Sequence, residues 1–263
     1  MTTAPPPLSH LVANGRQALL GWAELADPMI VGMMARAGFD AILLDAQHGF
    51  HNEATVMAGL TEAALCGKPA LVRVAVGAYP LAARMLDYGA AGVVAPMINI
   101  AEEASRFVAE VKYPPLGGRS WGPTRAMQIQ QQADPQAFLA AQNTRCAAIA
   151  MIETRSAMDN LDAILAVEGL DGVLIGPGDL SIGLSGGRLD PVGAQVSEAI
   201  AAILQAARRH GKLACAFAGT QERAADMIAL GFDITTVGYD TKLIGDAFDN
   251  AVAYMRGRMG QPG

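Results

Sequence analysis

The chain has few charged residues and no run of basic ones. Only 17% of its 263 residues are charged, against roughly 25% in an average soluble domain, whereas 52% are hydrophobic. Lys and Arg together number 19 and Asp and Glu 25, which gives a net charge of −6. We therefore expect a large buried core, no nucleic-acid partner and no membrane partner.

Long apolar runs and paired cysteines are also missing. No apolar stretch approaches the roughly 18 residues that a membrane span needs. The opening MTTAPPPLSH has neither the basic nor the apolar region of a secretory signal. Cys66, Cys146 and Cys215 lie far apart and suggest neither a disulfide framework nor a metal knuckle. Together these absences predict a cytoplasmic protein.

What the chain does contain is a repeated alternation of short apolar runs and longer amphipathic segments. Several of the short runs are continuously apolar, as expected of strands covered on both faces. The pattern predicts strands at residues 18–25, 41–46, 70–76, 92–98, 147–153, 172–176, 212–217 and 234–238. Helices are predicted at residues 28–37, 52–65, 80–88, 101–111, 157–167, 192–209, 221–230 and 244–256.

Eight strand–helix pairs in about 250 residues predict a single-domain TIM (β/α)8 barrel of the α/β class over residues 1–263. An open doubly wound sheet has the same rhythm and is the competing fold. Residues 1–16 form an N-terminal extension. The irregular segment 114–143 is too long for an ordinary connection, so we expect a lid near the active-site mouth or a mobile segment.

Two acidic residues follow neighbouring predicted strands, where a barrel places its chemistry. Glu153 ends the fifth strand and Asp179 follows the sixth. A divalent cation would keep both carboxylates ionised, and oxygen ligands suit Mg²⁺ or Mn²⁺. The alternative is that Glu153 pairs with Arg155 and that Asp179 merely caps a helix.

His48 follows the second strand, three residues after Asp45. A carboxylate so near could orient the imidazole and make it a general acid or base, although a satisfied loop histidine is the simpler interpretation. A metal cluster of His48, His51 and Glu53 is a weaker alternative, because only the spacing of these residues along the chain supports it.

Arg73 lies inside the apolar third strand, where a guanidinium needs an anionic partner. The partner is either a substrate carboxylate or a core acid such as Asp45. The turn IGPGDLS allows backbone amides to approach an anion at a helix start, or is only a tight turn. Taken alone, Asp87 is a solvated acid on a helix.

Six blocks of the sequence, taken together and in order, resemble the HpcH/HpaI aldolase family of metal-dependent class II aldolases. They are LLDAQHG, LVRV, PLAARMLDYGAAGVVAPMINIAEEA, KYPPLGGRS, IETRSAMDNLDAI and EGLDGVLIGPGDLS, between about residues 19 and 242. The chain looks most like the 4-hydroxy-2-oxoheptane-1,7-dioate and 2-keto-3-deoxy sugar acid aldolase branch. It departs from that family at Gln47, where Glu is common, and at Met151, where Gln is common.

The resemblance implies roles for particular residues. Glu153 and Asp179 would bind a divalent cation, Mg²⁺ or Mn²⁺ with Co²⁺ as a further candidate. Arg73 would contact the pyruvate oxygens, and the backbone amides of Gly178 and Asp179 would hold its carboxylate. His48, oriented by Asp45, matches the acid/base dyad.

The resemblance also implies an oligomer. Asp87 matches an acid that reaches the site of a neighbouring subunit. The family tends to form homohexamers, dimers of trimers, in which the last barrel helix packs against a partner subunit and is possibly swapped.

The resulting hypothesis is an aldehyde-lyase that reversibly cleaves a 4-hydroxy-2-oxo acid to pyruvate, or a hydroxypyruvate-like 2-oxo acid, and an aldehyde. Residues 216–220 and 114–125 would set the range of aldehydes. One rival is an acyl-CoA lyase of the citrate-lyase β type, and another is a phosphosugar isomerase or epimerase. A third is a barrel that only binds a 2-oxo acid. A Schiff-base aldolase is disfavoured because no lysine falls at an inward strand end.

Overall fold

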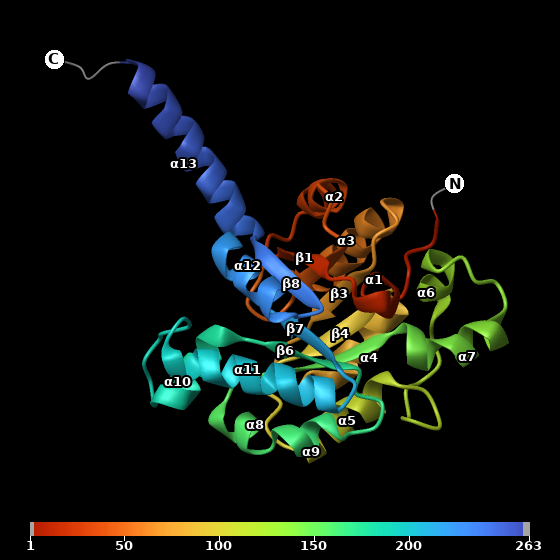
Figure 1. The fold of residues 1–263 in the computed structure, drawn as a ribbon. Coiled ribbons are helices and arrows are strands. Elements are labelled where there is room, and N and C mark those ends of the chain that lie inside the picture. Colours follow the sequence, from red (N-terminus) through yellow and green to blue (C-terminus); the bar gives the residue numbers. More distant parts are fainter. Residues whose placement is uncertain (1–2, 260–263) are drawn as a thin grey trace.

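The computed structural model describes residues 3–259 and contains a closed barrel of eight parallel strands (Figure 1). Each strand pairs with the next along the chain, and β8 pairs with β1. The strands are β1 (Ala18–Ala23), β2 (Ala41–Asp45), β3 (Ala70–Arg73), β4 (Gly92–Ala95), β5 (Ala147–Ile152), β6 (Gly172–Ile175), β7 (Leu213–Ala216) and β8 (Ile234–Tyr239). The predicted TIM barrel is confirmed, and every predicted strand coincides with an observed one.

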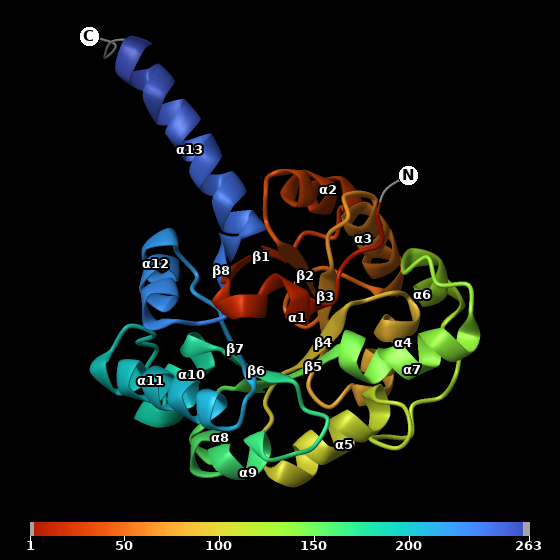
Figure 2. The same cartoon turned by 45° about the vertical axis from the view of Figure 1, so that its right-hand side comes forward.

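Helices surround the barrel in the described part of the chain (Figure 2). They are α1 (Leu8–Leu11), α2 (Pro28–Arg36), α3 (Glu53–Leu65), α4 (Tyr79–Asp87), α5 (Ala101–Val111), α6 (Thr124–Ile129), α7 (Pro135–Arg145), α8 (Arg155–Asp159), α9 (Leu161–Leu165), α10 (Pro177–Ser185), α11 (Ala194–Arg209), α12 (Gln221–Leu230) and α13 (Asp240–Met259), with a 3₁₀ turn at Ala13–Gly15. The helix predicted at 157–167 is split into α8 and α9. The sequence pattern did not predict α1, α6, α7 or α10.

The strands are buried because each has a core on both sides. Side chains that point inward, such as Leu20, Leu43 and Leu174, fill the barrel. Side chains that point outward, such as Ile42 and Val93, pack against the helices. This arrangement explains why the strands read as continuous apolar runs, and it leaves polar chemistry to the strand ends.

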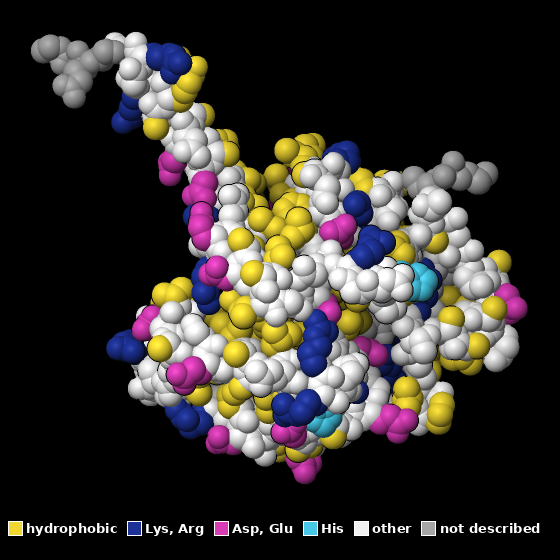
Figure 3. Space-filling model, in the orientation of Figure 1, with side chains coloured by type: hydrophobic (Ala, Val, Ile, Leu, Met, Phe, Trp, Pro, Cys, Tyr) yellow, Lys and Arg dark blue, Asp and Glu magenta, His cyan; other side chains and the backbone are white. Residues whose placement is uncertain are grey.

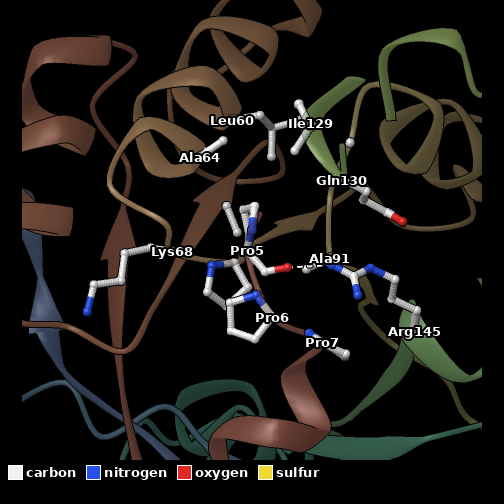
Figure 4. Close-up of a pocket in the computed structure, with 13 residues that line it drawn as sticks. Pro5, Pro6, Pro7, Leu60, Ala64, Lys68, Ala91, Ile129, Gln130 and Arg145 are labelled. Carbon is white, nitrogen blue, oxygen red and sulfur yellow. Dashed lines mark hydrogen bonds between the residues drawn. The ribbon is translucent and has the colours of Figure 1, made fainter. Parts of the chain in front are cut away.

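The N-terminal extension closes the end of the barrel where the strands begin. Leu8 of α1 is 1% exposed and packs among the inward-facing side chains. Figure 4 shows Pro5, Pro6 and Pro7 beside Leu60 and Ala64, with Arg145 donating a hydrogen bond to the Pro5 carbonyl. The cavity there measures about 20 Å³, room for about one water molecule. Residues 3–16 therefore belong to the barrel domain, while residues 1–2 and 260–263 lie outside the described residues.

Segment 114–143 lies at this same end, so the expected lid near the active-site mouth is wrong for the chain's own barrel. The segment connects the end of α5 to the start of β5, and such a connection lies opposite the carboxyl ends of the strands. Arg119 binds Asp87 at the end of α4, and Arg125 donates to Met57 of α3. The length of the segment is taken up by α6 and most of α7.

The last helix, α13, leaves the barrel instead of covering it (Figures 1 and 2). A barrel of this type normally packs its eighth helix over the last strand and the first. Here Leu19, on the outer side of β1, remains 37% exposed. Along α13, apolar side chains such as Phe248 and Val252 are at least half exposed. In the described residues, no helix combines the length and apolar character needed to span a membrane.

Candidate active site

A polar cavity of about 290 Å³ opens where the strands end. It is lined by Trp22, Glu24, His48, Arg73, Met151, Glu153, Gly176, Pro177, Gly178, Asp179, Phe217 and Tyr239. Charged and aromatic groups from seven strand ends thus converge on one space, as expected at the mouth of a TIM barrel. No lysine lines this cavity.

Glu153 is the most deeply buried acid of the cavity, at 2% exposed. Its Oε2 accepts a hydrogen bond of 2.9 Å from the backbone N–H of Met97. Met97 has φ 56°, a left-handed conformation that is uncommon for residues other than glycine. The strained turn after β4 therefore aims an amide at the carboxylate.

The other oxygen of Glu153, Oε1, accepts no hydrogen bond from the described residues and faces Gly176. A Cβ at Gly176 would lie 2.3 Å from Oε1, so no larger residue fits there without a shift. The pKa of Glu153 is raised to about 7, chiefly by burial and also by the nearby charge of Asp179, although the Met97 amide and Arg73 act in the opposite direction. A buried carboxylate with a free oxygen is a group that a cation would stabilise.

Asp179 lies in the first turn of α10 and reaches the same cavity. Its side chain is exposed, so it meets solvent and Glu153 from the open side. Pro177 begins the helix, and the first amide that bonds back within it is that of Leu180, which donates to Gly176. The amides of Gly178 and Asp179 are therefore left free at the helix start, where an anion would be favoured.

These donors fit a divalent cation that prefers oxygen. Glu153 and Asp179 supply two carboxylates, and no group of three or more His, Cys, Asp or Glu side chains suited to a metal occurs in the part of the chain that the structure describes. Water and substrate oxygens would complete such a coordination sphere, which is typical of Mg²⁺. The weaker alternative cluster of His48, His51 and Glu53 is not formed, because Glu53 binds Arg84 and Tyr88 instead.

Arg73 forms a two-pronged ion pair with Asp45. Its Nε lies 2.9 Å from Oδ1 and its Nη2 2.5 Å from Oδ2. The guanidinium stacks over the Trp22 ring at 4.7 Å, and Nη1 is 3.9 Å from the sulfur of Met151. Although burial opposes ionisation of Asp45, Arg73 and two backbone amides hold its pKa below the usual range. Nη1 has only a weak sulfur partner, so it remains available to a ligand in the cavity.

His48 lies at the exposed edge of the cavity. Its backbone N–H donates to Asp45 at 3.3 Å. Within the described residues the imidazole makes no hydrogen bond to that carboxylate, whose other partners are Arg73, the amide of Gln47 and the indole of Trp22. In this structure Asp45 thus fixes the backbone around His48 rather than its ring.

Asp87 lies outside this cavity. It ends α4 at the opposite end of the barrel, where its Oδ1 is 2.6 Å from Nη2 of Arg119. Arg119 is stacked at 4.6 Å over Tyr113 and is 5% exposed, and its Nε and Nη1 find no hydrogen-bond partner among residues 3–259. Asp87 therefore cannot act in the site of its own chain.

Three residues of the cavity were missed by the sequence analysis, namely Trp22, Glu24 and Tyr239, whereas Phe217 lies within residues 216–220, which were expected to set the range of aldehydes. Trp22 and Glu24 stand at the end of β1, and Phe217 and Tyr239 stand at the ends of β7 and β8. Phe217 packs edge-on against Trp22 at 4.9 Å and is stacked on Tyr239 at 6.0 Å. The rule that strand ends carry the chemistry could have found all three.

Comparison with known proteins relates this site to one family. A model of the HpcH/HpaI aldolase/citrate lyase family matches residues 18–247. The chain is 35% identical over 244 residues to a hydroxypyruvate/pyruvate aldolase of Rhizorhabdus wittichii, covering 92% of this chain and 96% of that protein. It is 31% identical over 251 residues to a 2-keto-3-deoxy-L-rhamnonate aldolase of Escherichia coli, covering 95% and 93%.

A solved structure with the same fold supports the relation. The HpcH/HpaI aldolase from Desulfitobacterium hafniense superposes with a TM-score of 0.87 at 26% identity, covering 98% of each chain. The likeness thus extends over the whole barrel and includes all the strand ends that form the cavity.

Replacing Glu153 by Gln should stabilise the metal-free protein at high pH. The folded state holds the Glu153 proton up to about pH 7, whereas an unfolded Glu releases it near 4.5, so folding stability falls as the pH rises between these values. We expect Glu153→Gln to raise the free energy of unfolding at pH 8 by up to about 3 kcal/mol and to change it little at pH 4.5. Urea unfolding in EDTA at both pH values measures this.

The matched control is Glu110→Gln, which removes an exposed carboxylate of α5. It should leave the difference between the two pH values unchanged. Equal destabilisation of Glu153→Gln at both pH values would contradict the burial argument.

Proposed function

Because the chain belongs to the HpcH/HpaI aldolase/citrate lyase family, we propose that it is a class II aldolase, a carbon–carbon lyase acting on 4-hydroxy-2-oxo acids. The products are pyruvate or a hydroxypyruvate-like 2-oxo acid, together with an aldehyde. The observation that carries the proposal is the pairing of buried Glu153 with Asp179 in a cavity that also holds Arg73 and free helix amides. The aldolase names of the relatives support the same activity.

Each group around the cavity has a task in this reaction. Glu153 and Asp179 would hold a divalent cation, Mg²⁺ or Mn²⁺. When bound, the cation polarises the carbonyl of the 2-oxo acid and offsets the negative charge that forms next to it. Nη1 of Arg73 donates a hydrogen bond to an oxygen of the 2-oxo acid. The positive charge of the guanidinium also stabilises the negative charge that forms next to the carbonyl. The amides of Gly178 and Asp179 donate to the substrate carboxylate.

His48 is the proposed general acid and base. In cleavage it takes the proton of the C4 hydroxyl, directly or through a water molecule, and in synthesis it returns this proton to the aldehyde oxygen. Its exposed position at the edge of the cavity suits a group that must exchange protons with solvent. Asp45 positions both residues, because its carboxylate accepts hydrogen bonds from the backbone N–H of His48 and from the guanidinium of Arg73.

The proposed partner of α13 is a second copy of this chain. The helix carries Phe248, Val252 and Met255 on its surface, all at least half exposed, and α2 exposes Met29 and Met33. Figure 3 shows hydrophobic side chains gathered on the face of the barrel beside α13. Exchange of this helix between copies would cover the exposed outer side of β1 at Leu19.

We further propose a homohexamer, which the family resemblance implies. Asp87 and Arg119, at the far end of the barrel, would then contribute to the site of a neighbouring copy.

Proton exchange at C3 of pyruvate tests the metal-dependent step. We expect the Mg²⁺-loaded protein to replace the methyl protons of pyruvate by deuterium in D₂O, followed by NMR, and EDTA to stop the exchange. Glu153→Ala should remove the response to added Mg²⁺, because one of its two carboxylate ligands is lost. Exchange that survives both EDTA and Glu153→Ala would contradict the site and indicate a Schiff base.

The role of His48 has its own test. We expect His48→Ala to reduce kcat of aldol cleavage by about 10²- to 10⁴-fold, the usual contribution of general acid–base catalysis, and to leave Mg²⁺ binding measured by calorimetry unchanged. His10→Ala, an exposed histidine at the other end of the barrel, is the control. Turnover by His48→Ala at the wild-type rate would remove this residue from the mechanism.

The mass of the protein in solution tests the role of α13. The double variant Phe248→Glu/Val252→Glu should lower the mass measured by light scattering, because two carboxylates would be buried in the interface. Leu230→Glu, which alters an exposed leucine of α12, should leave the mass unchanged. A monomeric wild-type protein would refute the assembly.

A further inference from the structure

A second and larger cavity adjoins the candidate site. It measures about 470 Å³ and lies between the ends of β6 and β7, the loop of residues 186–193 and helices α11 and α12. It shares four lining residues with the polar cavity: Pro177, Gly178, Phe217 and Tyr239. The two cavities are therefore neighbours, with the aromatic pair Phe217 and Tyr239 between them.

The two cavities differ in chemistry. The first contains Arg73, His48 and two carboxylates. The second is lined mainly by apolar side chains, among them Ile175, Ile200, Ala218 and Met227. A ligand that filled both would need a polar reacting group and an apolar tail.

Charges at the rim of the second cavity are already matched. Arg223 lies 3.2 Å from Asp226, and Lys242 lies 2.9 Å from Asp246. Each cation is thus paired with an acid on its own helix and leaves little net charge to attract an anionic tail. Because these cations are already paired, we do not expect the second cavity to select a ligand whose tail ends in a carboxylate.

Exposed apolar residues at the cavity also need an explanation. Leu189 and Val192, in the loop between α10 and α11, are 67% and 60% exposed and line the cavity. Apolar side chains that gather at the edge of a cavity beside a reaction site are typical of a binding surface for an apolar group.

We propose that the second cavity binds the apolar tail of the aldehyde substrate, so that the enzyme prefers aldehydes with an unbranched hydrocarbon chain to small or hydroxylated ones. The proposal rests on the proposed aldolase function and adds the class of the electrophile. The aldehyde carbonyl lies in the polar cavity near His48, and its chain passes Phe217 and Tyr239 into the apolar one. Loss of a C3 proton from the 2-oxo acid supplies the electron pair for the new bond to this carbonyl carbon. The C=O π bond of the aldehyde breaks as that bond forms, and its oxygen takes a proton from His48 to become the C4 hydroxyl.

The test measures kcat/KM of aldol addition to pyruvate for propanal, butanal, pentanal and hexanal, with glyceraldehyde as the hydroxylated comparison. Burial of each methylene group should raise kcat/KM by about fourfold until the cavity is filled. Ala218→Phe, which fills the cavity, and Val192→Asn, which makes its edge polar, should each reduce the ratio of hexanal to propanal at least about fivefold. Val76→Asn is the matched control, because Val76 is 58% exposed and lines neither cavity; it should keep the wild-type ratio.

Deuterium exchange into pyruvate needs no aldehyde, so it tests the proposed aldolase function separately from the tail site. Exchange at the wild-type rate in Ala218→Phe and Val192→Asn, together with a reduced ratio of hexanal to propanal, supports the tail site. A wild-type protein that exchanges pyruvate but shows no dependence on chain length, or prefers glyceraldehyde, overturns the tail site and leaves the aldolase function intact. Loss of exchange in the wild-type protein refutes the aldolase function itself.

Discussion

The buried carboxylate of Glu153 is the constraint on which the rest of the site depends. An acid at 2% exposure is costly to ionise, and the surrounding structure offsets this cost only in part. The left-handed turn at Met97 supplies one amide, and Arg73 supplies a positive charge at longer range. Gly176 leaves room beside Oε1. These features lie at three different strand ends, those of β4, β3 and β6, and they meet at one carboxylate.

The hydrogen bonds of Arg73 show that it need not have a single anionic partner, although the sequence presented Asp45 and a substrate carboxylate as alternatives. An arginine inside an apolar strand needs an anion, and both Asp45 and a substrate were candidates. The guanidinium has five N–H donors in a fixed fork, and Asp45 occupies only the Nε and Nη2 side of that fork. A structural ion pair and a ligand contact through Nη1 are therefore compatible. Met151 beside Nη1 is a weak acceptor, so it competes little with a substrate oxygen.

Much of the fold and part of the site could be predicted because they follow from local pattern. Eight apolar runs predicted the barrel, and the rule of strand ends located Glu153, Asp179 and His48. Arg73 was singled out as a charge inside an apolar run, and all four residues line one cavity. The sequence order also places segment 114–143 at the end of the barrel where the strands begin, because the segment follows a helix and precedes a strand. Its length instead suggested a lid over the active-site mouth. The local pattern could not predict the direction of α13, since an amphipathic helix shows which face is apolar and not which barrel it covers; only the family resemblance implied that this helix packs against a partner subunit.

The aromatic wall of Phe217 and Tyr239 divides the mouth into two regions that discriminate ligands by different physics. In the polar cavity, a ligand without a matching anion leaves Nη1 of Arg73 and the helix amides without a strong acceptor, and such mismatches are strongly rejected. In the apolar cavity, a missing methylene costs only the lost burial, so neighbouring chain lengths differ by small factors. With the proposed tail site, the enzyme would select the 2-oxo acid by its charge and would discriminate among aldehydes by the length of their hydrocarbon chain. Differences among related barrels in the range of aldehydes are therefore expected in the loops beside β6 and β7, whereas the strand ends that carry Arg73 and Glu153 have little freedom to vary.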